Sequence, residues 1–82
     1  MDEMELRGNF AYILKRLRKN KKMSQEKLAL NSNLDRTYIS LLERGVRNPT
    51  LPTIFKLSIV LEITPSQFIK QVEEITYENK NL

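Results

Sequence analysis

The chain has 82 residues, which make one domain and leave little room for a deep pocket beside a core. It contains no Cys and no His, which excludes disulfides, the usual zinc ligand sets, a thiol nucleophile and the commonest acid–base residue. The net charge is +4. No apolar run is long enough to cross a membrane, and the acidic N-terminus does not resemble a signal peptide. We therefore expect a cytoplasmic protein that is not an enzyme and needs no metal, cofactor or small-molecule ligand.

The charge is distributed unevenly along the chain. Residues 7–56 contain twelve Lys or Arg against three acids, whereas residues 1–6 and 57–82 hold more acids than bases. A single charged run is usually only the solvated face of a helix. A basic bias over fifty residues produces a field suited to a polyanion, and it therefore favours a nucleic acid as the partner.

The first predicted helix is amphipathic. Its apolar residues recur at positions i, i+3, i+4 and i+7, namely Phe10, Ile13, Leu14 and Leu17. This pattern predicts a helix from about Leu6 to Asn20. Gly8 and Asn9 are poor helix formers, which leaves the start of this helix open.

Two short helices joined by a tight turn follow. Ser24 is a good N-cap for a second helix, which is expected to end near Ser32 and Asn33 because Asn tolerates a left-handed backbone. Asp35 caps a third helix, and Gly45 occupies the position where a glycine commonly ends a helix. The sequence therefore predicts a helix–turn–helix unit.

The third helix has one apolar and one polar face. The positions predicted to face the core, here and in the preceding segment, are Leu28, Leu34, Ile39, Leu42 and Val46. The outward positions are then Arg36, Thr37, Ser40 and Arg44. A face with guanidinium groups and hydroxyls, mounted across a tight turn, is what the major groove of DNA accepts. Leu41 lies on the same outward face, where it either touches a thymine methyl or is merely exposed.

Two further helices complete the chain. Thr50 with Pro52 in the first turn opens a fourth helix, which is predicted to bury Ile54, Leu57 and Leu61. Thr64 and Pro65 repeat this start for a fifth helix, whose apolar side carries Phe68, Ile69, Val72 and Ile75. We expect a single all-α domain of residues 1–82, with a core over residues 6–75 and a polar tail over 76–82.

Four strings in the sequence resemble the phage-repressor or Xre-type helix-turn-helix family over about Phe10 to Phe68. They are Ser24-Gln25-Glu26-Lys27-Leu28-Ala29, Leu34-Asp35-Arg36-Thr37-Tyr38-Ile39-Ser40, Glu43-Arg44-Gly45 and Arg47-Asn48-Pro49-Thr50-Leu51. The resemblance implies a five-helix λ-repressor-like domain whose second and third helices form the helix-turn-helix. Within the family, these strings are similar to controller proteins of bacterial restriction–modification systems.

The resemblance also implies a function and a set of site residues. It implies a homodimeric transcription regulator on a palindromic double-stranded DNA operator, with RNA polymerase as a further partner. By position, Gln25 would hold a phosphate, while Arg36 and Thr37 would read bases. The residues that would contact bases or backbone are Tyr38, Ser40, Arg44, Arg47 and Asn48. Arg18 and Glu43 would form an internal salt bridge. Tyr38 could instead only pack its ring, and ordinary capping explains Gln25 without DNA.

Dimerisation is also favoured by an excess of apolar residues. Phe55, Ile59 and Val60 lie off the predicted buried stripe of the fourth helix, and Ile69 and Val72 are further candidates for the dimer interface. A domain this small gains stability from association. The alternative is that the fifth helix covers these residues within one subunit.

Two other functions use the same fold. A phage-type repressor normally carries a second domain for oligomerisation or cleavage, which these 82 residues do not contain. An antitoxin-like module that binds a toxin protein usually needs an added segment, for which the residues after Ile75 are few. The resemblance to controller proteins is therefore preferred.

Overall fold

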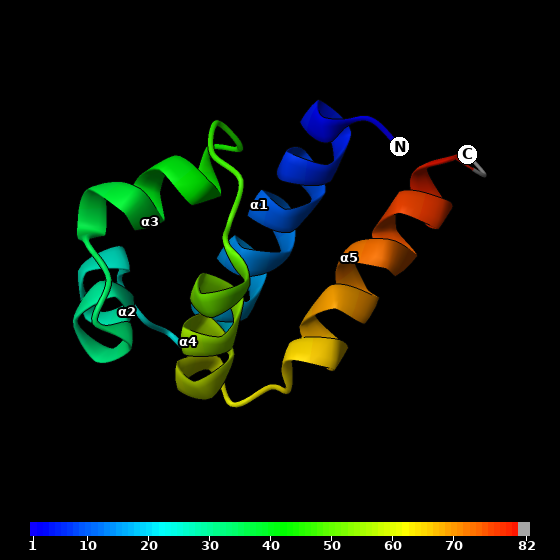
Figure 1. The fold of residues 1–82 in the computed structure, drawn as a ribbon. Helices are drawn as coiled ribbons and strands as arrows, with labels where there is room; N and C mark the ends of the chain where they lie inside the picture. Colours follow the sequence, from blue (N-terminus) through cyan, green and yellow to red (C-terminus); the bar gives the residue numbers. More distant parts are fainter. Residues whose placement is uncertain (81–82) are drawn as a thin grey trace.

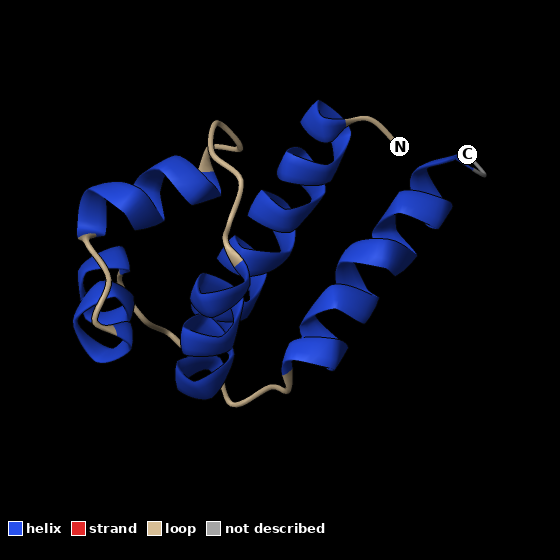
Figure 2. Ribbon diagram, viewed as in Figure 1, coloured by secondary structure: helices blue, strands red, loops and turns tan. Residues whose placement is uncertain are grey.

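A computed structural model describes residues 1–80, with side chains for residues 1–75. It contains five helices, α1 (Glu3–Asn20), α2 (Gln25–Ser32), α3 (Arg36–Glu43), α4 (Leu51–Leu61) and α5 (Pro65–Lys80). No strand occurs in the described residues, which confirms the predicted all-α class (Figure 2). Helices α1 and α5 pack side by side, and α3 packs against both α1 and α2 (Figure 1). None of the described helices is long and apolar enough to span a membrane.

Helix α1 begins at Glu3, three residues before Leu6, so the predicted start was wrong. The carboxylate of Asp2 accepts a hydrogen bond from the backbone N–H of Glu5 at 2.7 Å and so caps the helix. Acidic residues in the first turn also suit the positive end of the helix dipole. Gly8 therefore lies in the second turn of a well-capped helix, where its low helix propensity is outweighed.

The caps of α2 and α3 are those predicted. Ser24 accepts from the N–H of Lys27 at 3.0 Å, and Asp35 accepts from the N–H of Thr37 at 2.7 Å. Asn33 has a left-handed backbone with φ of 57°. Gly45 likewise has a positive φ of 72°, directly after the α3 C-cap. Backbone conformation at these two positions therefore fixes the ends of both helices.

Val46 was wrongly predicted to face the core. Its side chain is 49% exposed. The helical spacing from Ile39 and Leu42 holds only while the helix continues, and α3 ends at Glu43. The left-handed turn at Gly45 then directs Val46 away from the buried stripe.

Helices α4 and α5 are both capped by threonine. Thr50 accepts from the N–H of Thr53 at 3.2 Å. Thr64 accepts from the N–H of Gln67 at 3.1 Å while the Gln67 side chain accepts from the N–H of Thr64 at 3.0 Å, which is a capping box. The segment predicted as a polar tail from residue 76 is helical as far as Lys80, and residues 81–82 lie outside the described residues.

The core takes side chains from all five helices. Its fully buried apolar members include Ile13, Leu14, Leu28, Ile39, Leu42, Leu57 and Phe68. The rings of Phe10 and Phe68 are stacked with centroids 5.0 Å apart and planes within 5°, which joins α1 to α5. This stacking places α5 along the side of α1, opposite the helix-turn-helix.

A nearly buried ion pair joins α1 to the end of α3. The Nε of Arg18 lies 2.6 Å from Oε2 of Glu43, and its Nη2 donates to Oε1 at 2.9 Å. The side chains are 10% and 3% exposed. Nη1 of Arg18 also donates to the carbonyl of Met23 at 2.7 Å, which ties in the chain just before α2. The hydrogen bond to Glu43 raises the pKa of Arg18 despite the opposing effect of burial, so this guanidinium stays charged.

Removing one member of this ion pair is expected to be strongly destabilising. Arg18→Met leaves the Glu43 carboxylate nearly buried without its cation, at a cost of about 3–5 kcal/mol in the free energy of unfolding. The double variant Arg18→Met, Glu43→Met should lose less than either single variant, because no uncompensated charge remains. Urea unfolding of the four proteins measures this, and a double variant that loses the sum of the single effects contradicts it.

Truncating the stacked ring of α5 is expected to loosen the core. Phe68→Ala removes a fully buried ring and its stacking partner for Phe10, and should cost about 3–5 kcal/mol in the free energy of unfolding. Lys70→Ala, an exposed position on the same helix, is the matched control and should change it by less than about 0.5 kcal/mol. Equal unfolding midpoints for the two variants would show that α5 is not packed on α1 in solution.

Candidate nucleic-acid interface

Four of the predicted site residues line one shallow hollow at the surface. They are Gln25, from the start of α2, and Arg36, Thr37 and Ser40, from α3. The hollow has a volume of about 220 Å³. Its lining side chains end in amide, guanidinium and hydroxyl groups, which all donate hydrogen bonds. The helix-turn-helix thus brings together residues that are up to fifteen positions apart in the sequence.

The first turn of α3 presents Arg36 and Thr37 to solvent. Both side chains are exposed, and no side-chain hydrogen bond or ion pair holds Arg36 among the residues that the structure describes. The Asp35 cap uses the side chain of the residue before them and leaves theirs available. A long unpaired guanidinium at a helix N-terminus reaches outward and is suited to a planar acceptor pair.

Gln25 is held in place by the ion pair behind it. Its Nε2 donates to Oε1 of Glu43 at 3.1 Å, and the residue is half-buried. The amide has a second N–H that this bond does not use. Arg18, Glu43 and Gln25 therefore form one connected network of hydrogen bonds.

Tyr38 joins α3 to α4. It is half-buried against the core, and its hydroxyl lies 3.3 Å from Oγ1 of Thr53. Thr53 in turn lies 2.9 Å from the Thr50 hydroxyl that caps α4. The sequence left open whether Tyr38 only packs its ring. The ring does pack against the core, and its hydroxyl also reaches α4. Leu41, which was predicted to lie on the outward face of α3, is half-buried and is not among the residues that line the hollow.

The loop between α3 and α4, residues 44–50, adds basic and polar groups beside α3. Its exposed members include Arg44, Arg47 and Asn48. Arg7 of α1 donates from Nε to the carbonyl of Gly45 in this loop at 3.3 Å. No pattern in the sequence indicates that contact, because the two residues are 38 positions apart and Arg7 belongs to none of the recognised strings.

An exposed apolar stripe runs along α4. Leu51, Phe55 and Ile59 recur every four residues and are 68%, 51% and 78% exposed. Ile69 of α5 is also half-exposed, and Val60 is half-buried against the core. Leu51, which shares this spacing with Phe55 and Ile59, had not been predicted to be an exposed apolar residue. Val72, the remaining residue predicted for the dimer interface, is 3% exposed within the single chain.

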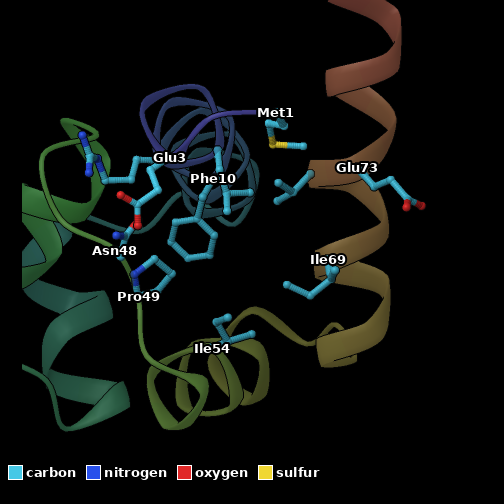
Figure 3. A pocket seen from close by; sticks show the side chains of 11 residues that line it. Met1, Glu3, Phe10, Asn48, Pro49, Ile54, Ile69 and Glu73 are labelled. Atoms are coloured by element: carbon cyan, nitrogen blue, oxygen red, sulfur yellow. The ribbon is translucent and has the colours of Figure 1, made fainter.

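A groove of about 440 Å³ opens between α1, α5 and the start of α4 (Figure 3). Its mainly apolar lining includes Phe10, Pro49, Ile54 and Ile69, with Asn48 at one side and Glu73 at the other. No cluster of acidic side chains that could hold a metal occurs among the described residues.

Comparison with known proteins gives consistent results. The family model described as "Helix-turn-helix" matches residues 14–68. The control protein C.MunI of Mycoplasma sp is 41% identical over 75 residues, which cover 90% of this chain and 99% of that protein. Two solved structures are similar as well. The restriction–modification controller protein C.AhdI from Aeromonas hydrophila is 44% identical with a TM-score of 0.73, over 76% of this chain and 94% of that one.

The second solved structure is of an assembly. It is the restriction–modification controller protein C.Esp1396I as a tetramer in complex with its natural 35 base-pair operator. That protein is 38% identical with a TM-score of 0.76, over 84% of this chain and 91% of that one. Residues 14–68, which the family model matches, include both helices of the helix-turn-helix and the start of α5. The chain therefore belongs to the Xre-type helix-turn-helix family and is similar to its restriction–modification control proteins.

Proposed function

We propose that this chain is a sequence-specific DNA-binding transcription regulator that controls restriction–modification genes as a dimer on a palindromic operator. The observation that carries the proposal is the unpaired Arg36 at the start of α3, in a hollow shared with Thr37, Ser40 and Gln25. The similarity to control proteins, one of which is solved on its operator, supports the assignment. No catalytic role is part of this proposal.

In this proposal α3 enters the major groove. Arg36 and Thr37 read base edges, because residues in the first turn of a recognition helix reach deepest. A bidentate contact from Arg36 to a guanine is worth about 1–3 kcal/mol of discrimination. Ser40, one turn further along α3, lies in the same hollow and contacts the next bases or the backbone.

The remaining predicted residues act on the DNA backbone. Gln25 uses the N–H that Glu43 leaves available to hold a phosphate. Arg44, Arg47 and Asn48 are exposed beside α3, while the Tyr38 hydroxyl already has Thr53 as a neighbour and offers a single further contact. Phosphate contacts fix the position of the protein but carry no sequence information. The basic bias of residues 7–56 adds the long-range attraction.

A second copy of the chain is proposed to cover the α4 stripe. Phe55, Ile59 and Ile69 are exposed apolar residues that water would otherwise contact, and Val60 contributes its exposed edge. A two-fold dimer repeats the recognition helix at the spacing of successive major grooves, roughly 34 Å. The oligomeric state of the related C.Esp1396I on its operator supports self-association. Regulation of transcription in the cytoplasm further implies RNA polymerase as a partner.

The base-reading role of Arg36 can be tested by gel-shift titration. DNA from upstream of the chain's own gene and an unrelated duplex of equal length are titrated at two salt concentrations. Arg36→Ala should lose about 1–3 kcal/mol of preference for the upstream DNA, while its salt-dependent binding to the unrelated duplex remains. Lys70→Ala, on α5, should behave as wild type.

Two results would count against the proposal. If the wild-type protein binds both duplexes equally, the upstream DNA contains no operator for it. Arg36→Ala that keeps the full preference shows that another residue reads the bases. In either case a pull-down for a protein partner of the helix-turn-helix is the next experiment.

The dimer interface can be tested by sedimentation over a range of concentrations. The double variant Phe55→Ala, Ile59→Ala should raise the dimer dissociation constant at least about tenfold, because buried anchors dominate such interfaces. Leu30→Ala is the matched control, since Leu30 is an equally exposed apolar residue on α2. The interface is misplaced if Leu30→Ala dissociates the dimer and the double variant does not.

A further inference from the structure

The α3–α4 loop (residues 44–50) lies directly against the backbone of α1. A Cβ placed on Gly45 would be 3.5 Å from the Cα of Gly8, and the φ of Gly45 is positive. At this contact the half-buried Arg7 donates from Nε to the Gly45 carbonyl at 3.3 Å. The extra first turn of α1, capped by Asp2, is what makes Arg7 part of a rigid helix.

Helix α1 thus holds the end of α3 at two points. Arg18 binds Glu43, the last residue of α3, and Arg7 binds Gly45, two residues later. The two arginines are eleven positions apart on α1, a rise of roughly 16 Å, so they contact the end of α3 from two separate turns of α1. Such an arrangement fixes both the position and the direction in which the chain leaves α3.

The loop has few other restraints. The N–H groups of Gly45 and Val46 donate to carbonyls of α3 at 3.1 and 3.2 Å. Within the described residues, the N–H groups of Arg47 and Asn48 donate to no backbone carbonyl. The Arg7 contact is therefore the last side-chain tether before these two exposed residues. Arg7 and Asn48 also line the same groove, which places Arg7 close to the loop beyond Gly45.

We infer that Arg7 is a positioning residue for DNA binding: by holding the Gly45 carbonyl, it orients the loop that presents Arg47 and Asn48 to the phosphate backbone. This inference rests on the proposed function. Arg7 itself is half-buried and its Nε is engaged by a carbonyl, so it acts through the loop. Because phosphate contacts are indifferent to sequence, Arg7 contributes to affinity and not to base discrimination.

A double-mutant cycle tests this role. Arg7→Met keeps the apolar stem but removes the donor, and should weaken binding to operator and unrelated DNA by the same factor, about threefold to tenfold. In an Arg47→Ala, Asn48→Ala background the same change should alter affinity by less than about twofold, because both contacts that it supports are already absent. In an Arg36→Ala background the full factor should persist. Arg7→Lys, which retains a donor, should recover most of the binding.

Hydrogen exchange of the free protein provides a second measurement. In Arg7→Met, the amide protons of Gly45 and Val46 should exchange faster than in wild type, because the loop loses its tether. The amides of Ile39 and Leu42 in the buried part of α3 should keep their protection. A general loss of stability would instead accelerate exchange at all four positions.

The outcomes separate this inference from the proposed function. The positioning role is overturned if Arg7→Met keeps its full effect in the Arg47→Ala, Asn48→Ala background, since Arg7 would then contact DNA itself. It is also overturned if the exchange of the Gly45 and Val46 amides is unchanged. Wild-type protein that fails to prefer operator DNA refutes the proposed function, and the exchange measurement then still decides whether Arg7 holds the loop.

Discussion

The ion pair between Arg18 and Glu43 is the interaction on which the geometry of the helix-turn-helix depends. Helices α2 and α3 have eight residues each, which is too short for either to be stable alone in water. The guanidinium of Arg18 connects α1, the chain before α2, and the end of α3 through Met23 and Glu43. Because the pair is nearly buried, its carboxylate and guanidinium must stay together, and the angle of α3 is fixed by the same constraint.

The proposed DNA-binding side chains of α2 and α3 are positioned by that ion pair. The side-chain amide of Gln25 donates a hydrogen bond to Glu43, so the ion pair also positions the side chain of the first residue of α2. Arg36 and Thr37 remain exposed because Asp35 satisfies the helix N-terminus with its own side chain. The buried charges of Arg18 and Glu43 hold the helices in place, while the exposed side chains of Arg36 and Thr37 can still form hydrogen bonds with a ligand. Tyr38 and Arg7 then extend the scaffold to α4 and to the α3–α4 loop.

A small domain with one continuous core leaves apolar surface on its outer helices. The exposed stripe on α4 and the groove between α1, α5 and the start of α4 are two such surfaces. A second copy that covers the α4 stripe, as proposed above, would remove these apolar side chains from water.

Local chemistry determined much of this protein from sequence alone. The caps at Ser24, Asp35 and Thr50 and the turns at Asn33 and Gly45 require specific residue types, so the five helices and most of the core could be predicted. The start of α1 and the exposure of Val46 follow from local features that periodicity does not encode, namely the Asp2 cap and the end of α3 at Glu43. The burial of Val72 depends on how α5 packs against the rest of the chain. Likewise, only the tertiary structure brings Arg7 to Gly45 and Gln25 to Glu43, because contacts between residues far apart in sequence arise from how whole helices pack.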